Sequence, residues 1–289
     1  MSCLDDPTDA DALVLGAGGV AGIAWQLGLL AGVAAGGHDL TRADLVIGTS
    51  AGATVAAQIT AGVPLDALVA RQVDPALRGP ELSPASPAAS RRATIATLVD
   101  GARSPAERRR RIAAAALRAE TVAPAARRAV IAARLPAHAW PAIDLRIVAV
   151  DASTGERRVL TQADGLPLVD AVAASCAVPL TWPPVELDGR PYVDGGLWSG
   201  ENADLAAGAR RVVVLAPSLG ASLAAGGGLD EQVAALRHDG AAVTVLRPDD
   251  AARAAIGDDP LDPDARAPAA LAGERQGRAL AVDWSSVAA

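Results

Sequence analysis

Apolar runs and alanine-rich stretches alternate along the first part of this chain. Leu13-Val14-Leu15 is typical of a buried strand, residues 16–19 of a glycine-rich turn, and Val20 to Ala35 of a helix. The pattern repeats with a strand at Asp44 to Ile47 and a helix at Ala51 to Ala61. Strands that alternate with helices form a mostly parallel sheet covered on both faces. We therefore expect an α/β fold with three layers, α/β/α, around a mostly parallel central sheet.

The same pattern resumes after residue 144. The expected strands are Leu145 to Val150, Arg157 to Thr161, Val185 to Leu187, Arg190 to Val193, Arg211 to Leu215 and Ala242 to Leu246, and the expected helices are Pro167 to Ser175 and Ala267 to Ala281. Asp188-Gly189, between two of these strands, favours a type I′ hairpin turn. The chain of 289 residues is long enough for one large domain, and we expect a single domain over residues 1–289.

A segment of different character interrupts the sheet pattern. Residues 64–141 are rich in arginine and read as helices, such as Pro105 to Ala119, broken by the proline-bearing stretch Pro75 to Pro87. We interpret this segment as an inserted helical cap. Its run Arg108 to Arg111 would make one helix face cationic, which suits either solvent or the anionic headgroups of a membrane surface.

Composition narrows the function classes. The chain is 51% hydrophobic but 2% aromatic, and alanine, which suits both core and surface, weakens every argument from periodicity. The net charge of −7 provides no basic excess, so we expect no nucleic-acid partner. Cys3 and Cys176 are too few for a disulfide framework, which favours a reducing, cytoplasmic location with at most peripheral contact to a membrane.

The uncharged segment from Ala12 to Gly37 raises the question of a membrane span, because Gly28, Gly32 and Gly36 repeat a small-xxx-small spacing. Glycines interrupt the segment, Gln26 lies in its middle, and no aromatic belt or cluster of basic residues flanks it. We interpret it as a buried strand, turn and helix. The acidic residues before it also argue against a secretory signal.

Candidate chemistry begins at Gly48-Thr49-Ser50-Ala51-Gly52, which closes an apolar strand and opens a helix. This G-x-S-x-G pattern is typical of a nucleophile elbow, in which Gly48 and Gly52 permit the tight turn that exposes Ser50. The elbow serine needs donors for the developing oxyanion. Gly18, Gly19 and Val20 lie where a strand ends and a helix begins, so their amides are free of helical partners and suit that role.

The same glycine-rich turn supports a rival hypothesis. Residues Gly16 to Ala21 satisfy the dinucleotide pattern G-x-G-x-x-A, and Asp39 follows roughly 20 residues later. An NAD(P)-binding oxidoreductase is therefore an alternative. It is weakened because Asp39 does not close a second apolar strand.

The serine also needs a base. Of the three histidines, only His238 comes late enough in the chain for a Ser-His-Asp hydrolase, and it lies at the end of an amphipathic helix, an ordinary surface position. A second candidate is Asp194, which ends a short strand and is followed by Gly195-Gly196. Carboxylates at strand tips lie at a sheet edge, where active sites gather.

Taken together, these motifs resemble the patatin-like phospholipases, lipid acyl hydrolases that use a serine and aspartate dyad without histidine. Three blocks match in order: the loop Ala17 to Gly22, the elbow at Ser50, and Asp194-Gly195-Gly196. The flanking matches are residues 174–179, 183–185, 192–196, Asn202, 260–263 and 273–277. The resemblance implies that Ser50 is the nucleophile, that Asp194 is the general base, and that no metal or cofactor takes part.

Two positions depart from the family pattern. Ala17 and Ala21 stand where the family commonly has a loop glycine and a basic residue. The missing basic side chain bears on how an anionic headgroup is held, and it leaves open a patatin-like protein that binds without catalysing. The resemblance implies a lipid or other acyl ester as substrate. It sets neither the headgroup nor the oligomeric state.

Overall fold

The computed structural model describes residues 8–218, 228–285 and 287, so Cys3 lies outside the described residues. The strands are β1 (Thr8–Leu15), β2 (Leu45–Thr49), β3 (Asp144–Asp151), β4 (Arg157–Leu160), β5 (Val185–Leu187), β6 (Arg190–Asp194), β7 (Ala209–Leu215) and β8 (Ala242–Leu246). The helices are α1 (Gly19–Ala35), α2 (Ala51–Ile59), α3 (Leu65–Val73), α4 (Ala88–Val99), α5 (Pro105–Ala116), α6 (Pro124–Arg134), α7 (Leu168–Ser175), α8 (Leu229–His238), α9 (Asp250–Ile256) and α10 (Arg266–Arg278).

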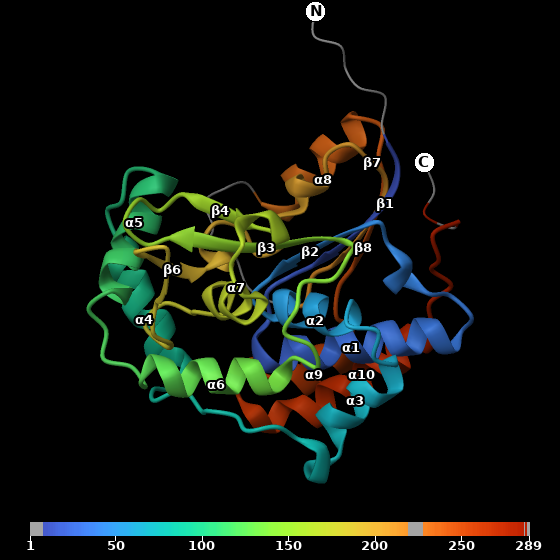
Figure 1. The fold of residues 1–289 in the computed structure, drawn as a ribbon, viewed down its shortest axis with the longest axis horizontal. Coiled ribbons are helices and arrows are strands. Elements are labelled where there is room, and N and C mark those ends of the chain that lie inside the picture. Colours follow the sequence, from blue (N-terminus) through green and yellow to red (C-terminus); the bar gives the residue numbers. More distant parts are fainter. Residues whose placement is uncertain (1–7, 219–227, 286, 288–289) are drawn as a thin grey trace, which may run out of the picture.

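The strands form one mixed sheet with the order β5-β6-β3-β2-β1-β7-β8, and β4 pairs with β3 outside this path. The five strands β1, β2, β3, β7 and β8 run parallel to one another, whereas β4, β5 and β6 are antiparallel to their neighbours. Helices cover both faces of the sheet, with α1, α2, α9 and α10 on one side and α8 on the other (Figure 1). The expected α/β/α architecture with a mostly parallel sheet is confirmed.

Side chains of β1 alternate between the two faces of the sheet. Leu13 and Leu15 belong to the large core on the side of α1 and α2, while Ala12 and Val14 belong to the smaller core on the side of α8. All four side chains are fully buried. A central parallel strand is buried on both faces, which is why this part of the sequence reads as a continuous apolar run.

The uncharged glycine-bearing helix is half of a close helix pair. On α1, a Cβ added to Gly28 or Gly32 would lie 2.0 or 2.2 Å from a backbone oxygen of α10, and Gly273 and Gly277 of α10 approach α1 equally closely. Glycines on both helices thus let the two backbones touch. This packing accounts for the spacing of small residues, and within the described residues no helix is long and apolar enough to cross a membrane.

The segment between α2 and β3 is helical, as expected, and consists of α3 to α6. Its arginine run does not form one cationic face. Arg109 is buried, stacks 4.0 Å from the centroid of the Trp198 ring and donates to the backbone oxygen of Gly155, whereas Arg111 pairs with Glu107 at 2.6 Å. Consecutive residues point around a helix at 100° intervals, so four in a row cannot share a face.

The turn between β5 and β6 has the predicted geometry. Both central residues have positive φ, 50° at Asp188 and 72° at Gly189, as a type I′ turn requires. The hairpin reverses the chain direction, so that β6 pairs antiparallel with β3 and ends at Asp194.

Candidate active site

Two strand ends meet along one edge of β3. Thr49, the last residue of β2, pairs with Val148, and Asp194, the last residue of β6, pairs with the next residue, Ala149. The opposite edge of β3 is occupied there by β4. Because β2 runs parallel to β3 and β6 runs antiparallel, the carboxyl ends of β2 and β6 face each other. The residue after Thr49 is Ser50, which is thereby brought to Asp194.

Ser50 occupies a strained turn between β2 and α2. Its φ of 55° and ψ of −114° are rare for a residue with a side chain, and such strain is common where a functional group must be exposed. The flanking glycines let the turn pack closely against neighbouring backbone atoms. A Cβ on Gly52 would lie 1.9 Å from the backbone oxygen of Leu15, and one on Gly48 would lie 2.6 Å from the Cα of Ala53. This is the geometry of a nucleophile elbow.

The Ser50 hydroxyl donates a hydrogen bond to Oδ2 of Asp194 over 2.7 Å. The other carboxylate oxygen, Oδ1, accepts from the Gly196 backbone N–H at 2.7 Å. Burial raises the pKa of Asp194 from its ordinary value of 3.8 to about 6, against the two hydrogen bonds and the positive charge of Arg127, which lower it. A carboxylate with a raised pKa is a stronger base that is still ionised at neutral pH.

Side chains from α7 hold the elbow in place. The Ser50 backbone N–H donates to Oγ of Ser175 at 2.9 Å, and that hydroxyl donates in turn to the Val148 backbone oxygen at 2.6 Å. The Cys176 thiol donates to the Ser50 backbone oxygen at 3.1 Å. Sequence reasoning assigned no role to this pair. The signal was their place in the flanking block of residues 174–179.

Asn202 braces the other side of the elbow. Its amide nitrogen donates to Oγ1 of Thr49 at 3.0 Å and to the backbone oxygen of Ser199 at 2.7 Å. The side chain is fully buried, and its amide oxygen accepts from Arg157 at 3.2 Å, so both of its polar atoms are satisfied. Asn202 fixes the residue that immediately precedes Ser50.

The glycine-rich loop presents free amides at the start of α1. The neighbouring amides are occupied, because Ala17 N–H donates to the Gly200 oxygen at 2.8 Å and Ala21 N–H donates to the Pro260 oxygen at 3.0 Å. Within the described residues, the amides of Gly18, Gly19 and Val20 have no hydrogen-bond partner. They lie at the positive end of the helix dipole, where negative charge is stabilised.

Gly19 cannot be replaced in this loop without a shift of the chain. Its φ is +62°, and a Cβ at this position would lie 2.3 Å from the backbone oxygen of Pro260. The segment 260–263 therefore packs directly against the loop that carries the free amides.

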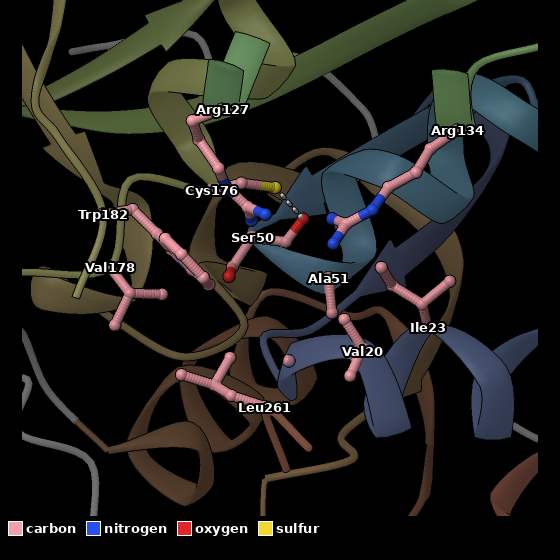
Figure 2. A pocket seen from close by; sticks show the side chains of 11 residues that line it. Val20, Ile23, Ser50, Ala51, Arg127, Arg134, Cys176, Val178, Trp182 and Leu261 are labelled. Atoms are coloured by element: carbon pink, nitrogen blue, oxygen red, sulfur yellow. Dashed lines mark hydrogen bonds between the residues drawn. The ribbon is translucent and has the colours of Figure 1, made fainter. Parts of the chain in front are cut away.

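Ser50 opens into a small pocket (Figure 2). The pocket combines apolar side chains with two arginines from α6, and the elbow and loop form its floor. Its lining residues are Gly19, Val20, Ile23, Ser50, Ala51, Arg127, Arg134, Cys176, Val178, Trp182 and Leu261. The combination of a nucleophile, free amides and an apolar wall suits the acyl group of an ester.

The alternative site residues do not converge on Ser50. His238 is exposed at the end of α8, and His38 lies 2.9 Å from Asp283. Asp39 accepts hydrogen bonds from Thr41 before β2 begins. Since β1 and β2 are parallel, Asp39 lies at the opposite end of the sheet from the loop of Gly16 to Ala21, where a dinucleotide would need it.

The structure thus contains a buried serine at a strand–helix elbow, hydrogen-bonded to a buried carboxylate on an α/β scaffold. Comparison with known proteins gives the family. The sequence model of the patatin-like phospholipase family matches residues 13–207. Because the match covers more than half of the sequence, the chain belongs to the patatin-like phospholipase family.

Among solved structures, the chain is similar to VipD from Legionella pneumophila, with 14% sequence identity and a TM-score of 0.40. The match covers 74% of this chain and 51% of the VipD chain, so this chain spans about half the length of that protein. No curated protein matches the sequence.

Proposed function

We propose that this protein is a serine hydrolase that cleaves carboxylic esters of lipids through a Ser50–Asp194 dyad. The observation that carries the proposal is the 2.7 Å hydrogen bond from the Ser50 hydroxyl to a buried carboxylate, beside free amides at the start of α1. A serine hydroxyl is a weak nucleophile at neutral pH and needs an adjacent base. Asp194 is the group that the Ser50 hydroxyl contacts.

The proposed reaction has two halves. Asp194 accepts the Ser50 proton as the serine oxygen attacks the ester carbonyl, and the amides of Gly18, Gly19 and Val20 stabilise the negative charge of the tetrahedral intermediate. The carbon–oxygen bond to the alcohol then breaks, and the proton on Asp194 passes to the leaving alcohol. Water attacks the acyl-serine with Asp194 again as base, which releases the fatty acid and restores Ser50.

The proposal extends to the rest of the chain. Residues 1–289 act as one hydrolase domain, in which the helical segment 64–141 is a cap over the sheet and supplies two side chains of the pocket. The substrate is a lipid or related acyl ester that the enzyme reaches from the cytoplasm by transient contact with a membrane surface. The dyad and the oxyanion loop need neither a metal nor a cofactor for this chemistry.

Ester hydrolysis by matched variants tests the dyad. Wild-type protein is expected to cleave p-nitrophenyl butyrate and one or more members of a phospholipid, lysophospholipid and monoacylglycerol panel. Ser50→Ala and Asp194→Asn are each expected to lose activity by on the order of 10³-fold or more, because the dyad acts as a unit. Asp188→Asn changes an exposed turn aspartate in the same way and serves as the control. Hydrolysis at the wild-type rate by Ser50→Ala or Asp194→Asn would exclude the proposed dyad.

A further inference from the structure

Two arginines of the helical cap face the proposed nucleophile. Arg127 and Arg134 lie seven residues apart on α6, which is two helical turns, so both point to the same side. Both line the pocket of Ser50 and flank this serine (Figure 2). The glycine-rich loop carries no basic side chain, because residues 16–22 are glycines, alanines and one valine. Positive charge thus reaches the site from a different element.

One carboxylate serves both arginines. Arg127 donates to Oε1 of Glu81 at 3.3 Å, and Arg134 donates to Oε2 through Nε at 3.2 Å and through Nη2 at 2.5 Å. Within the described residues, neither arginine forms a second ion pair. The two guanidinium groups and the Glu81 carboxylate give this cluster a net charge of +1, and the charge of Arg127 also acts on the Asp194 carboxylate.

The charge of Arg127 is buried and incompletely paired. The residue is 6% exposed, and its Nε is buried without a hydrogen-bond partner among the described residues. Its guanidinium stacks over the Trp182 ring, 4.1 Å from the centroid, which fixes its plane. Burial and the nearby charge of Arg134 lower the pKa of Arg127 to about 10, so it stays protonated at neutral pH. A buried cation with unused donors is favourable only when an anion completes its partners.

We propose that Arg127 and Arg134 form an anion subsite that holds a phosphate or carboxylate group of the substrate next to the ester attacked by Ser50. The inference rests on the proposed hydrolase function and narrows its substrates to acyl esters that carry a nearby negative charge. Planar guanidinium groups bind such anions through paired hydrogen bonds. Glu81 fixes both arginine side chains by accepting some of their N–H groups, and the other N–H groups of the two guanidiniums are available to the ligand.

A matched pair of esters tests the subsite. Mono-p-nitrophenyl glutarate and p-nitrophenyl pentanoate have the same acyl length and differ in a terminal carboxylate against a methyl group. Wild-type enzyme is expected to prefer the glutarate ester in kcat/KM. Arg127→Gln and Arg134→Gln are expected to reduce that preference by about 10- to 100-fold, mainly through KM, because bonds to a charged group are lost. The control is Arg128→Gln on the same helix, whose exposed side chain pairs with Asp170 and whose variant keeps the preference.

Loss of activity on both esters to the same extent would overturn the proposal, because the arginines would then act on the reaction common to both esters. If the glutamine variants fail to fold, the ester preference is measured for Arg127→Lys, and the effect of phosphate on it is measured for the wild-type protein. Sodium phosphate should suppress the wild-type preference for the glutarate ester, whereas an equal ionic strength of sodium chloride should leave more of it. No wild-type preference for the glutarate ester would also overturn the subsite.

Binding measurements separate a substrate group from a free ion. Titration with inorganic phosphate and with glycerol phosphate, followed by tryptophan fluorescence because Arg127 stacks on Trp182, should show binding that Arg127→Gln weakens. Phosphate binding without ester preference would identify a site for free anions and overturn the substrate role. If Ser50 proves unreactive, this titration still tests the subsite, so its failure and that of the dyad are distinguishable.

Discussion

Asp194 has full burial and a hydrogen bond from the hydroxyl that it is proposed to activate. Burial destabilises its charge and raises its pKa to about 6, which makes it a better proton acceptor than an exposed aspartate. The bonds from Ser50 and Gly196 and the charge of Arg127 limit that rise. In the proposed reaction, the environment of this one carboxylate sets both the reactivity of Ser50 and the pH range in which Ser50 can act.

The pH dependence of hydrolysis follows from this pKa. Asp194 must be ionised to accept the serine proton, so kcat/KM for a neutral ester is expected to fall tenfold per pH unit below about pH 6. A histidine base would produce a similar limb, since its ordinary pKa is about 6.5. The profile should therefore be repeated with His38, His138 and His238 all changed to alanine. A limb that disappears in this variant would assign the base to a histidine.

The raised pKa also carries a cost in stability. The native state binds the Asp194 proton more tightly than the unfolded state does. The free energy of unfolding that this group contributes is therefore fully present at low pH and is lost as the pH rises from about 4 to 6. Above pH 6, this pKa shift corresponds to a loss of about 3 kcal/mol in the free energy of unfolding. Asp194→Asn is expected to be more stable than wild type to urea at pH 7.5, with a smaller difference at pH 4.5. Equal stability at both pH values would show that burial does not strain the carboxylate.

Some site residues could be predicted from the sequence and others could not. Ser50 and Asp194 each follow an apolar strand and precede glycines, so local pattern marks them as strand-tip side chains. The proposed role of Arg127 depends on the path of the helical segment between α2 and β3, which no local pattern specifies. The cationic run at Arg108 to Arg111 gives no indication of Arg127 and Arg134, because charge density along a sequence does not tell which side chains are buried.

At the scale of elements, the pair α1 and α10 fixes the position of the glycine-rich loop. The two helices pack through Gly28 and Gly32 on one side and Gly273 and Gly277 on the other. The loop precedes α1 directly, and its amide at Ala21 bonds to Pro260, which precedes α10. Small residues at these contacts therefore hold the free amides at a fixed place relative to Ser50.

Alanine substitution at Gly32 of α1 and at Gly36, which follows the last residue of α1, tests this contact. A methyl group at Gly32 would lie 2.2 Å from the Glu274 backbone oxygen, so Gly32→Ala is expected to destabilise the protein by about 1–3 kcal/mol. Gly36, the next glycine in the same spacing, meets no atom of α10, and Gly36→Ala is the control. Urea unfolding of both variants gives the comparison. Equal effects would mean that close approach does not explain the glycines.

Element types were predictable where periodicity or turn chemistry was strong. The strand at Ala242 to Leu246 and the Asp188-Gly189 hairpin have the expected bounds and geometry. The first strand begins at Thr8, earlier than its apolar core suggested, because Asp11 pairs with Arg211 of the neighbouring β7. Such a long-range ion pair lets a charged residue enter a strand and leaves no local signal.

At the scale of the whole molecule, the site draws on segments that are far apart in the sequence. The family match ends at residue 207, yet β7 pairs with β1, and Leu261 lines the pocket beyond that limit. The meeting of β2 and β6 on one edge of β3 brings Ser50 to Asp194, which lies 144 residues further along the chain. The order of motifs indicated a shared site, but the edge at which they meet follows only from the sheet.

The proposed hydrolase activity requires Ser50 to act as a nucleophile that Asp194 activates. The most direct measurement is labelling of the full chain with a fluorophosphonate probe, with the modified peptide identified by mass spectrometry. Wild-type protein is expected to carry the adduct on Ser50, Ser50→Ala to carry none, and Asp194→Asn to label about 10²- to 10⁴-fold more slowly, the usual contribution of a general base. Failure of wild-type Ser50 to label, or labelling of Asp194→Asn at the wild-type rate, would contradict it.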